Sequence, residues 1–142
     1  MKTYHSTKPH AGKNDDNLIT RVISKDLAFS IVADGRGDKN GKRASGVVCS
    51  IFGKDLETRL IEEGSTDLTD FMWSRLTEVN NDLLVPKGAE TTAEIVIVDK
   101  ANGIIDSYHI GDSSQILVYD NGELEYITPA PPDIPTDRKS VV

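Results

Sequence analysis

The chain has 142 residues and a formal net charge of −7, with 23 acidic residues against 16 basic ones. A length of this kind predicts one domain that can bury a hydrophobic core. The acidic surplus argues against broad contact with a nucleic-acid backbone, which favours clustered Lys and Arg. It fits either ordinary solubility or a set of carboxylates that bind cations.

Cys49 is the single cysteine of the chain, which excludes an internal disulfide and a cysteine-rich zinc site. A reducing compartment is therefore expected, and we predict a cytoplasmic location. The first residues contain no apolar run, and no stretch approaches the roughly 20 apolar residues that span a bilayer. The sequence predicts no signal peptide and no membrane contact.

The first structured region is predicted to be a β-hairpin. Residues 1–12 are polar, and strands are predicted at 18–23 and 27–33, joined by a tight turn. Asp15 and Asp16 precede the first strand, and Asp34 follows the second. Because the start of one antiparallel strand lies beside the end of its neighbour, these carboxylates are expected to meet.

Two helices are predicted next from the 3.6-residue spacing of apolar side chains. The first runs from Gly41 to Gly64, and the second begins with Thr66 or Asp67 as its cap and ends at Pro86. Trp73 does not share the apolar face of the second helix. The predicted inner face of that helix comprises Leu68, Phe71, Met72, Leu76, Val79 and Leu83.

The last third of the chain is predicted to form β-strands. Segments 93–99, 104–110, 115–119 and 123–128 are separated by turns, including Asn121-Gly122, a typical hairpin pair. They predict an antiparallel meander, so residues 1–128 form an α+β domain with helices layered on a sheet. Residues 129–142 begin with a proline-rich tail, which is not expected inside a sheet.

Four aspartates lie at junctions between loops and strands: Asp15, Asp16, Asp34 and Asp112. Carboxylate and carbonyl oxygens are the ligands of Mg²⁺ and Mn²⁺. The glycine in Asp34-Gly35 allows its carbonyl to turn toward an ion. Two such ions activate a water for attack on a phosphate ester without a protein nucleophile.

Structural explanations compete with this metal hypothesis. Asp-Gly after a strand is a common turn, and Asp15-Asp16 could be a solvated cap. Residues 35–37 match neither a Walker loop nor the dinucleotide fingerprint, and Ser113 lacks the nucleophile-elbow pattern. The three histidines do not have the spacing of a zinc site.

Five short motifs in order resemble the metal-dependent serine/threonine protein phosphatases of the PP2C (PPM) family. Asn14-Asp15-Asp16 resembles Asn-Glu-Asp, and 34–45 resembles Asp-Gly-x-Gly-Gly followed by Gly-x-x-Ala-Ser. Residues 88–93 resemble a Gly-Thr-Thr-Ala strand entry, 108–114 resemble Asn-x-Gly-Asp-Ser-Arg, and 120–128 resemble a hairpin ending in Leu-Thr. Together the motifs span nearly the whole chain.

The resemblance implies an antiparallel β-sandwich flanked by helices and a site with two Mn²⁺ or Mg²⁺ ions, with a third, weaker ion near Asp112. Asp34 would bridge the metals, the Gly35 carbonyl would be a ligand, and Asp16 with Asp15 would hold a metal or its waters. Asp16 and Asp34 are thus the implied catalytic pair. The implied substrate is a phosphorylated protein carrying phosphoserine or phosphothreonine.

Several positions depart from the family pattern. Asp38 replaces a glycine, Ser114 replaces an arginine, and Lys13 stands near the place of the phosphate-binding arginine. Lys13 can supply charge to a phosphate but not a bidentate fork. The family's later aspartates would lie beyond residue 142, so the sequence predicts a domain that is incomplete at its C-terminus and exposes apolar surface suited to self-association.

Two alternative functions stay open beside the phosphatase. The first is a non-catalytic binding or regulatory module on the same scaffold, suggested by the replaced arginine. The second is an unrelated α+β interaction protein whose aspartates occupy ordinary turns. Calorimetry with Mn²⁺ discriminates between the first alternative and the phosphatase. The second alternative predicts that Asp15, Asp16 and Asp34 lie far apart.

Overall fold

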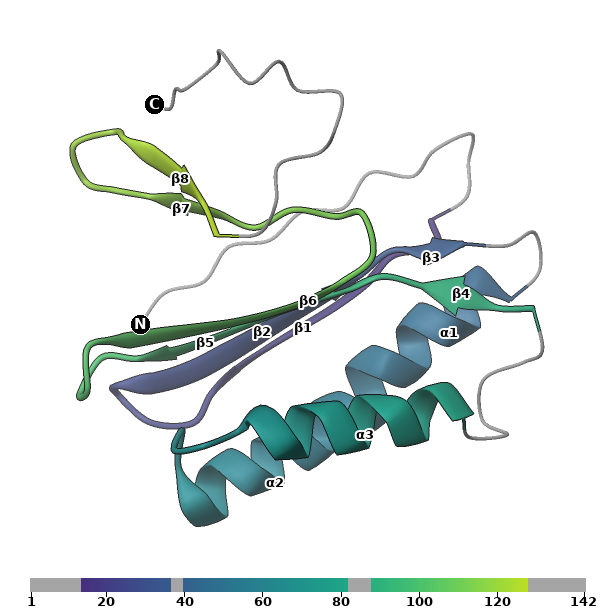
Figure 1. Ribbon diagram of the computed structural model, residues 1–142, viewed down its shortest axis with the longest axis horizontal. Helices are drawn as coiled ribbons and strands as arrows, with labels where there is room; N and C mark the ends of the chain where they lie inside the picture. Colours follow the sequence, from purple (N-terminus) through teal and green to yellow (C-terminus); the bar gives the residue numbers. More distant parts are fainter. Residues whose placement is uncertain (1–13, 37–39, 82–87, 128–142) are drawn as a thin grey trace.

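The computed structural model describes residues 14–36, 40–81 and 88–127, and it confirms an α+β fold built from antiparallel strands and helices (Figure 1). The elements follow in the order β1 (Asn17–Val22), β2 (Leu27–Ala33), β3 (Gly35–Arg36), α1 (Gly41–Val47), the π-helical turn η1 (Val48–Phe52), α2 (Gly53–Glu63), α3 (Thr69–Asn81), β4 (Glu90–Thr91), β5 (Ala93–Asp99), β6 (Ile104–Ile110), β7 (Ile116–Val118) and β8 (Leu124–Tyr126). The predicted tail lies outside the described residues.

The central sheet has four antiparallel strands in the order β1-β2-β5-β6. The β1–β2 and β5–β6 hairpins agree with the prediction, but the single four-stranded meander at the end of the chain is wrong. β5 pairs with β2, and β7 and β8 pair with each other in a separate two-stranded sheet. The break follows β6 at Gly111, whose φ of 111° takes the chain away from the extended conformation.

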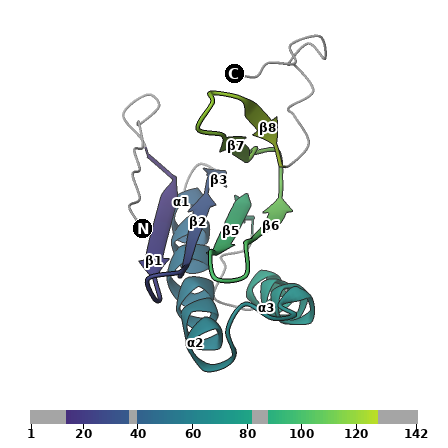
Figure 2. The same ribbon diagram turned by 90° about the vertical axis from the view of Figure 1, so that its left-hand side faces the viewer.

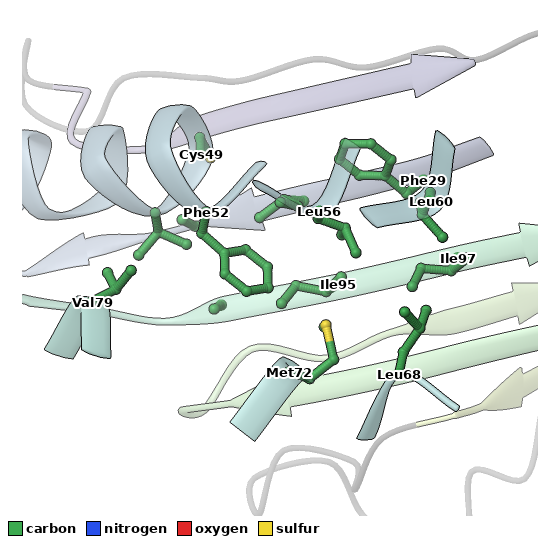
Figure 3. Packing of buried hydrophobic residues seen from close by; sticks show 14 residues of the cluster. Phe29, Cys49, Phe52, Leu56, Leu60, Leu68, Met72, Val79, Ile95 and Ile97 are labelled. Carbon is green, nitrogen blue, oxygen red and sulfur yellow. The ribbon is translucent and has the colours of Figure 1, made fainter. Parts of the chain in front are cut away.

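Helices cover one face of this sheet (Figures 1 and 2). Alternate side chains of β2 and β5 point toward them, so Phe29 and Ile31 share the core with Ile95 and Ile97. Figure 3 shows the helical side of the same cluster, which buries Phe52, Leu56, Leu60, Leu68 and Met72. Full burial of one such side chain contributes about 1.5–3 kcal/mol, so this layer holds helices and sheet together.

The predicted helix from Gly41 to Gly64 is one helical run with a π-helical turn inside it, and Gly64 ends it with a φ of 73°. The second helix starts later than predicted. Asp67 has a φ of 49°, outside the helical region, and the first helical residue is Thr69, so neither Thr66 nor Asp67 is its cap. Trp73 is 64% exposed, as its place off the apolar face predicted.

The other face of the sheet is partly covered by the β7–β8 hairpin (Figure 1). Gln115, just before β7, donates a 2.8 Å hydrogen bond to the buried carboxylate of Glu94, whose other oxygen lies 2.5 Å from His109 Nδ1. Farther along this face Val32 and Ile105 are 46% and 44% exposed. No helix in the described part of the chain is both long and apolar enough to cross a membrane.

Candidate functional site

The β1–β2 hairpin brings two of the predicted aspartates together. Asn17 is paired with Ala33, so Asp16 and Asp34 are the next residues at the same end of the two strands. Their side chains lie near enough for a protonated carboxyl of one to donate a hydrogen bond to the other. Asp16 is half-buried and Asp34 is exposed, which leaves the pair open to a ligand from solvent.

Two threonines fix the backbone of Asp34: Thr91 at the end of β4, and Thr92 between β4 and β5. The Asp34 amide donates to Thr92 Oγ1 at 3.0 Å, and the Asp34 carbonyl accepts from the Thr92 amide at 2.9 Å. Thr91 Oγ1 donates to the same carbonyl at 3.0 Å. The carboxylate therefore projects from a Cα whose two flanking peptide groups are both hydrogen-bonded, and a rigid backbone of this kind favours precise ligand geometry.

Thr92 also carries the loop that contains Asp112. Ser113 Oγ donates to Thr92 Oγ1 at 3.1 Å, and a Cβ added at Gly111 would lie 2.7 Å from Thr92 Cγ2. Gly111 is therefore needed both for its positive φ and for this close packing. As a result, Asp112 lines the same cavity as Asp34.

The start of α1 holds the other side of the site. A Cβ on Gly35 would lie 2.2 Å from the Gly41 carbonyl oxygen and 2.7 Å from the Asp15 carbonyl oxygen, so the three backbones are in direct contact. Ser45, which is fully buried, donates to the Asp15 carbonyl at 2.5 Å and accepts from Asn17 Nδ2 at 2.8 Å. The Gly-x-x-Ala-Ser motif thus positions the strand entry that carries Asp15.

Replacing Ser45 with alanine is expected to lower the free energy of unfolding by about 1–3 kcal/mol, because the partly buried Asp15 carbonyl would lose its donor. Urea denaturation of both proteins measures this difference. Ser50→Ala is the matched control, since the hydroxyl of exposed Ser50 bonds to the Gly46 carbonyl of its own helical run, and its effect should stay within about 0.5 kcal/mol. If both variants lowered the free energy of unfolding equally, the proposed stabilising role of the hydrogen bond from Ser45 to Asp15 would be contradicted.

Like charges are crowded at this edge of the sheet. The pKa of Asp34 is raised above its ordinary value by partial burial, by the hydrogen bond and negative charge of Asp16, and by the charges of Asp112 and Asp15. A carboxylate that is disfavoured in this way is stabilised by a nearby cation. The arrangement therefore favours binding of a positively charged ligand.

The carboxylates open onto a cavity of about 780 Å³ beside the β3–β4 pair. Its walls combine acidic side chains, two threonines and the glycines of the two turns. The lining residues are Asp34, Gly35, Arg36, Glu90, Thr91, Thr92, Gly111 and Asp112. A space of this size and polarity accommodates a small charged group better than an apolar ligand.

The donors in this cavity match a hard divalent cation in kind, because they are oxygens rather than sulfur or imidazole. Asp16 acts on Asp34 through both a hydrogen bond and its charge, whereas Asp15 and Asp112 act on Asp34 through their charge. Within the described ranges, no three His, Cys, Asp or Glu side chains are near enough to hold one ion. The identity and number of the predicted Mn²⁺ or Mg²⁺ ions therefore remain predictions.

The structure gathers Asp15, Asp16, Asp34, Gly35 and Asp112 at one end of the sheet, while Lys13 lies outside the described residues. Their roles as ligands or catalytic groups stay predictions. The positioning roles of Thr91, Thr92 and Ser45 were not foreseen. Their motifs were visible in the sequence, but only the pairing of distant strands shows what their hydroxyls contact.

The fold is that of bacterial serine/threonine phosphatases. A bacterial serine phosphatase matches with a TM-score of 0.63 and 20% identity over 89% of this chain and 60% of its own. The serine/threonine phosphatase of S. agalactiae matches with a TM-score of 0.55 and 23% identity over 85% of this chain and 51% of its own. No family model and no curated protein sequence matches the chain.

Proposed function

We propose that the chain is the part of a metal-dependent phosphoprotein phosphatase that carries the central carboxylate pair. The observation that supports this most directly is the meeting of Asp16 and Asp34 beside Asp15 and Asp112, on a fold shared with serine/threonine phosphatases. The proposed substrates are phosphoserine and phosphothreonine in proteins. The chain spans 60% and 51% of the two structures it resembles, so other ligands could come from outside residues 14–127.

In this proposal Asp34 and Asp16 hold the cation, with Asp15 and Asp112 binding it directly or through water. A bound divalent ion would lower the pKa of a water molecule and polarise the phosphoryl group. Thr91 and Thr92 keep the Asp34 backbone in place while the ester binds. The cavity is open to solvent, so a phosphorylated side chain can enter it without a large rearrangement.

A non-catalytic module on the same scaffold is the second candidate. It is favoured by one observation, namely that the described residues do not bring three metal-binding side chains together. The two candidates differ in their response to a cation. A phosphatase requires the ion for turnover, whereas a binding module can retain its partner without it.

Metal dependence provides the direct test. We expect the purified protein to hydrolyse para-nitrophenyl phosphate and a phosphothreonine peptide with Mn²⁺ or Mg²⁺, and EDTA should return the rate to that of buffer alone. Calorimetry with Mn²⁺ under the same conditions measures binding separately. Tight Mn²⁺ binding without hydrolysis of either substrate would favour the non-catalytic module, and activity that persists in EDTA would reject the metal-dependent mechanism.

A further inference from the structure

One basic side chain faces the carboxylate cavity. Arg36 forms β3 together with Gly35, directly after Asp34, and it is the sole Lys or Arg among the described residues that line this cavity. The other charged residues of the lining are Asp34, Glu90 and Asp112. An anionic ligand entering this cavity would meet one cation and three carboxylates.

Arg36 is not engaged by those carboxylates. It is exposed, and no hydrogen bond or ion pair joins its side chain to another residue of the described ranges. Arg21 and Arg75, in contrast, are paired: Arg21 contacts Glu57 at 3.5 Å, and Arg75 contacts Asp55 at 2.6 Å. No described residue therefore occupies the guanidinium donors of Arg36, which can reach a ligand in the cavity.

The backbone that carries Arg36 is well fixed. Arg36 is paired with Glu90, and Gly35 with Thr91, in the short β3–β4 ladder. Gly35 is also packed against the backbone of Gly41. The Cα of Arg36 is thus held beside Asp34, and only the side chain itself has to be ordered when a ligand binds.

We propose that Arg36 binds the phosphoryl oxygens of the substrate and orients the ester toward the Asp16–Asp34 pair. This inference rests on the proposed phosphatase function. A guanidinium can donate two parallel hydrogen bonds to a phosphate, which gives orientation as well as charge. Its position opposite several carboxylates places a positive charge where the phosphate dianion would otherwise be repelled.

Arg36→Gln removes the charge, and Arg36→Lys keeps the charge but loses the fork. We expect Arg36→Gln to weaken binding of inorganic phosphate, measured by calorimetry in Mg²⁺ buffer, about 10- to 100-fold, and to raise KM by a similar factor. Arg36→Lys should weaken phosphate binding less than Arg36→Gln, because the positive charge is kept. Calorimetry with Mg²⁺ alone should show no weakening of cation binding in either variant, which separates a phosphate-binding role from damage to the carboxylate site.

Arg43→Gln is the matched control, because Arg43 is an exposed arginine on α1 that does not line the cavity. It should leave phosphate affinity and KM unchanged.

The possible outcomes separate the role of Arg36 from the phosphatase function. If the unchanged protein hydrolyses phosphate esters while Arg36→Gln keeps its KM and phosphate affinity, the proposed role of Arg36 is wrong and the phosphatase function stands. If phosphate binds through Arg36 without hydrolysis, the phosphatase function and the orienting role of Arg36 fail, and only its binding of phosphate stands. Absence of phosphate binding to the unchanged protein would reject the inference.

Discussion

Asp34→Asn is expected to lower kcat for phosphate ester hydrolysis by more than about 100-fold. Loss of a residue that merely supports a metal ligand typically costs 10- to 100-fold in affinity or activity, and Asp34 is proposed to be a ligand itself. Steady-state assays with Mn²⁺ measure the change. The same substitution should abolish the rise in melting temperature that Mn²⁺ produces in the unchanged protein, because that rise reflects binding to the folded state.

The stability of this variant without metal provides an independent check. Because the pKa of Asp34 is raised from its ordinary 3.8 in the folded protein, ionisation of this group weakens the fold as the pH rises through the raised value. At neutral pH, asparagine removes the repulsion from Asp16, so the melting temperature in EDTA should not fall. Asp120→Asn, in the exposed β7–β8 turn, is the control and should change neither property. Full activity of Asp34→Asn would reject the proposed site.

Gly35→Ala is expected to disrupt the site through the backbone. The added Cβ would lie 2.2 Å from the Gly41 carbonyl oxygen and 2.7 Å from that of Asp15, and neither backbone atom can rotate away. The start of α1 or the entry to β1 must move. Overpacking of this kind costs about 1–3 kcal/mol, which urea denaturation would detect. Because Asp15 and Asp34 flank the clash, Mn²⁺ binding should be lost as well.

Gly46→Ala is the matched control for this steric effect. Gly46 also lies in α1, but the nearest atom to its added Cβ is Asn17 Nδ2 at 3.8 Å, an ordinary contact. Alanine in a helix is favoured over glycine by roughly 0.5–1 kcal/mol, so this variant should be at least as stable as the unchanged protein and should bind Mn²⁺ normally. Wild-type stability and Mn²⁺ binding in Gly35→Ala would contradict the close packing described above.

Most elements of the fold were predictable because their signals are local. Nearly continuous apolar runs defined β2 and β5, and the 3.6-residue spacing defined the long helical run ending at Gly64. Strand order was not predictable in this way, because no local pattern near β5 indicates that it pairs with β2 as well as with the strand that follows it. The late start of α3 depends on the unusual backbone conformation of Asp67, which its residue type does not require.

The aspartates of the site were predictable for a similar reason. A tight hairpin places residues 16 and 34 beside each other, and this needs only local geometry. The supporting hydroxyls were not predictable, since Thr92 lies 58 residues from Asp34 and Ser45 lies 30 residues from Asp15. Arg36 was not predicted to bind phosphate, because residues 35–37 match no known phosphate-binding loop, and its cavity exists only when β3 and β4 pair.

The bonds from Thr91 and Thr92 to Asp34 also determine when the site can form during folding. The β1–β2 hairpin closes a short loop, whereas the threonine contacts join residues separated by 57 and 58 positions. Contacts between distant positions form slowly, because much more of the chain must first be ordered. During synthesis Asp34 therefore leaves the ribosome well before its supports. Competence to bind a cation would then be acquired late, and its appearance in refolding experiments would report completion of the β2–β5 pairing.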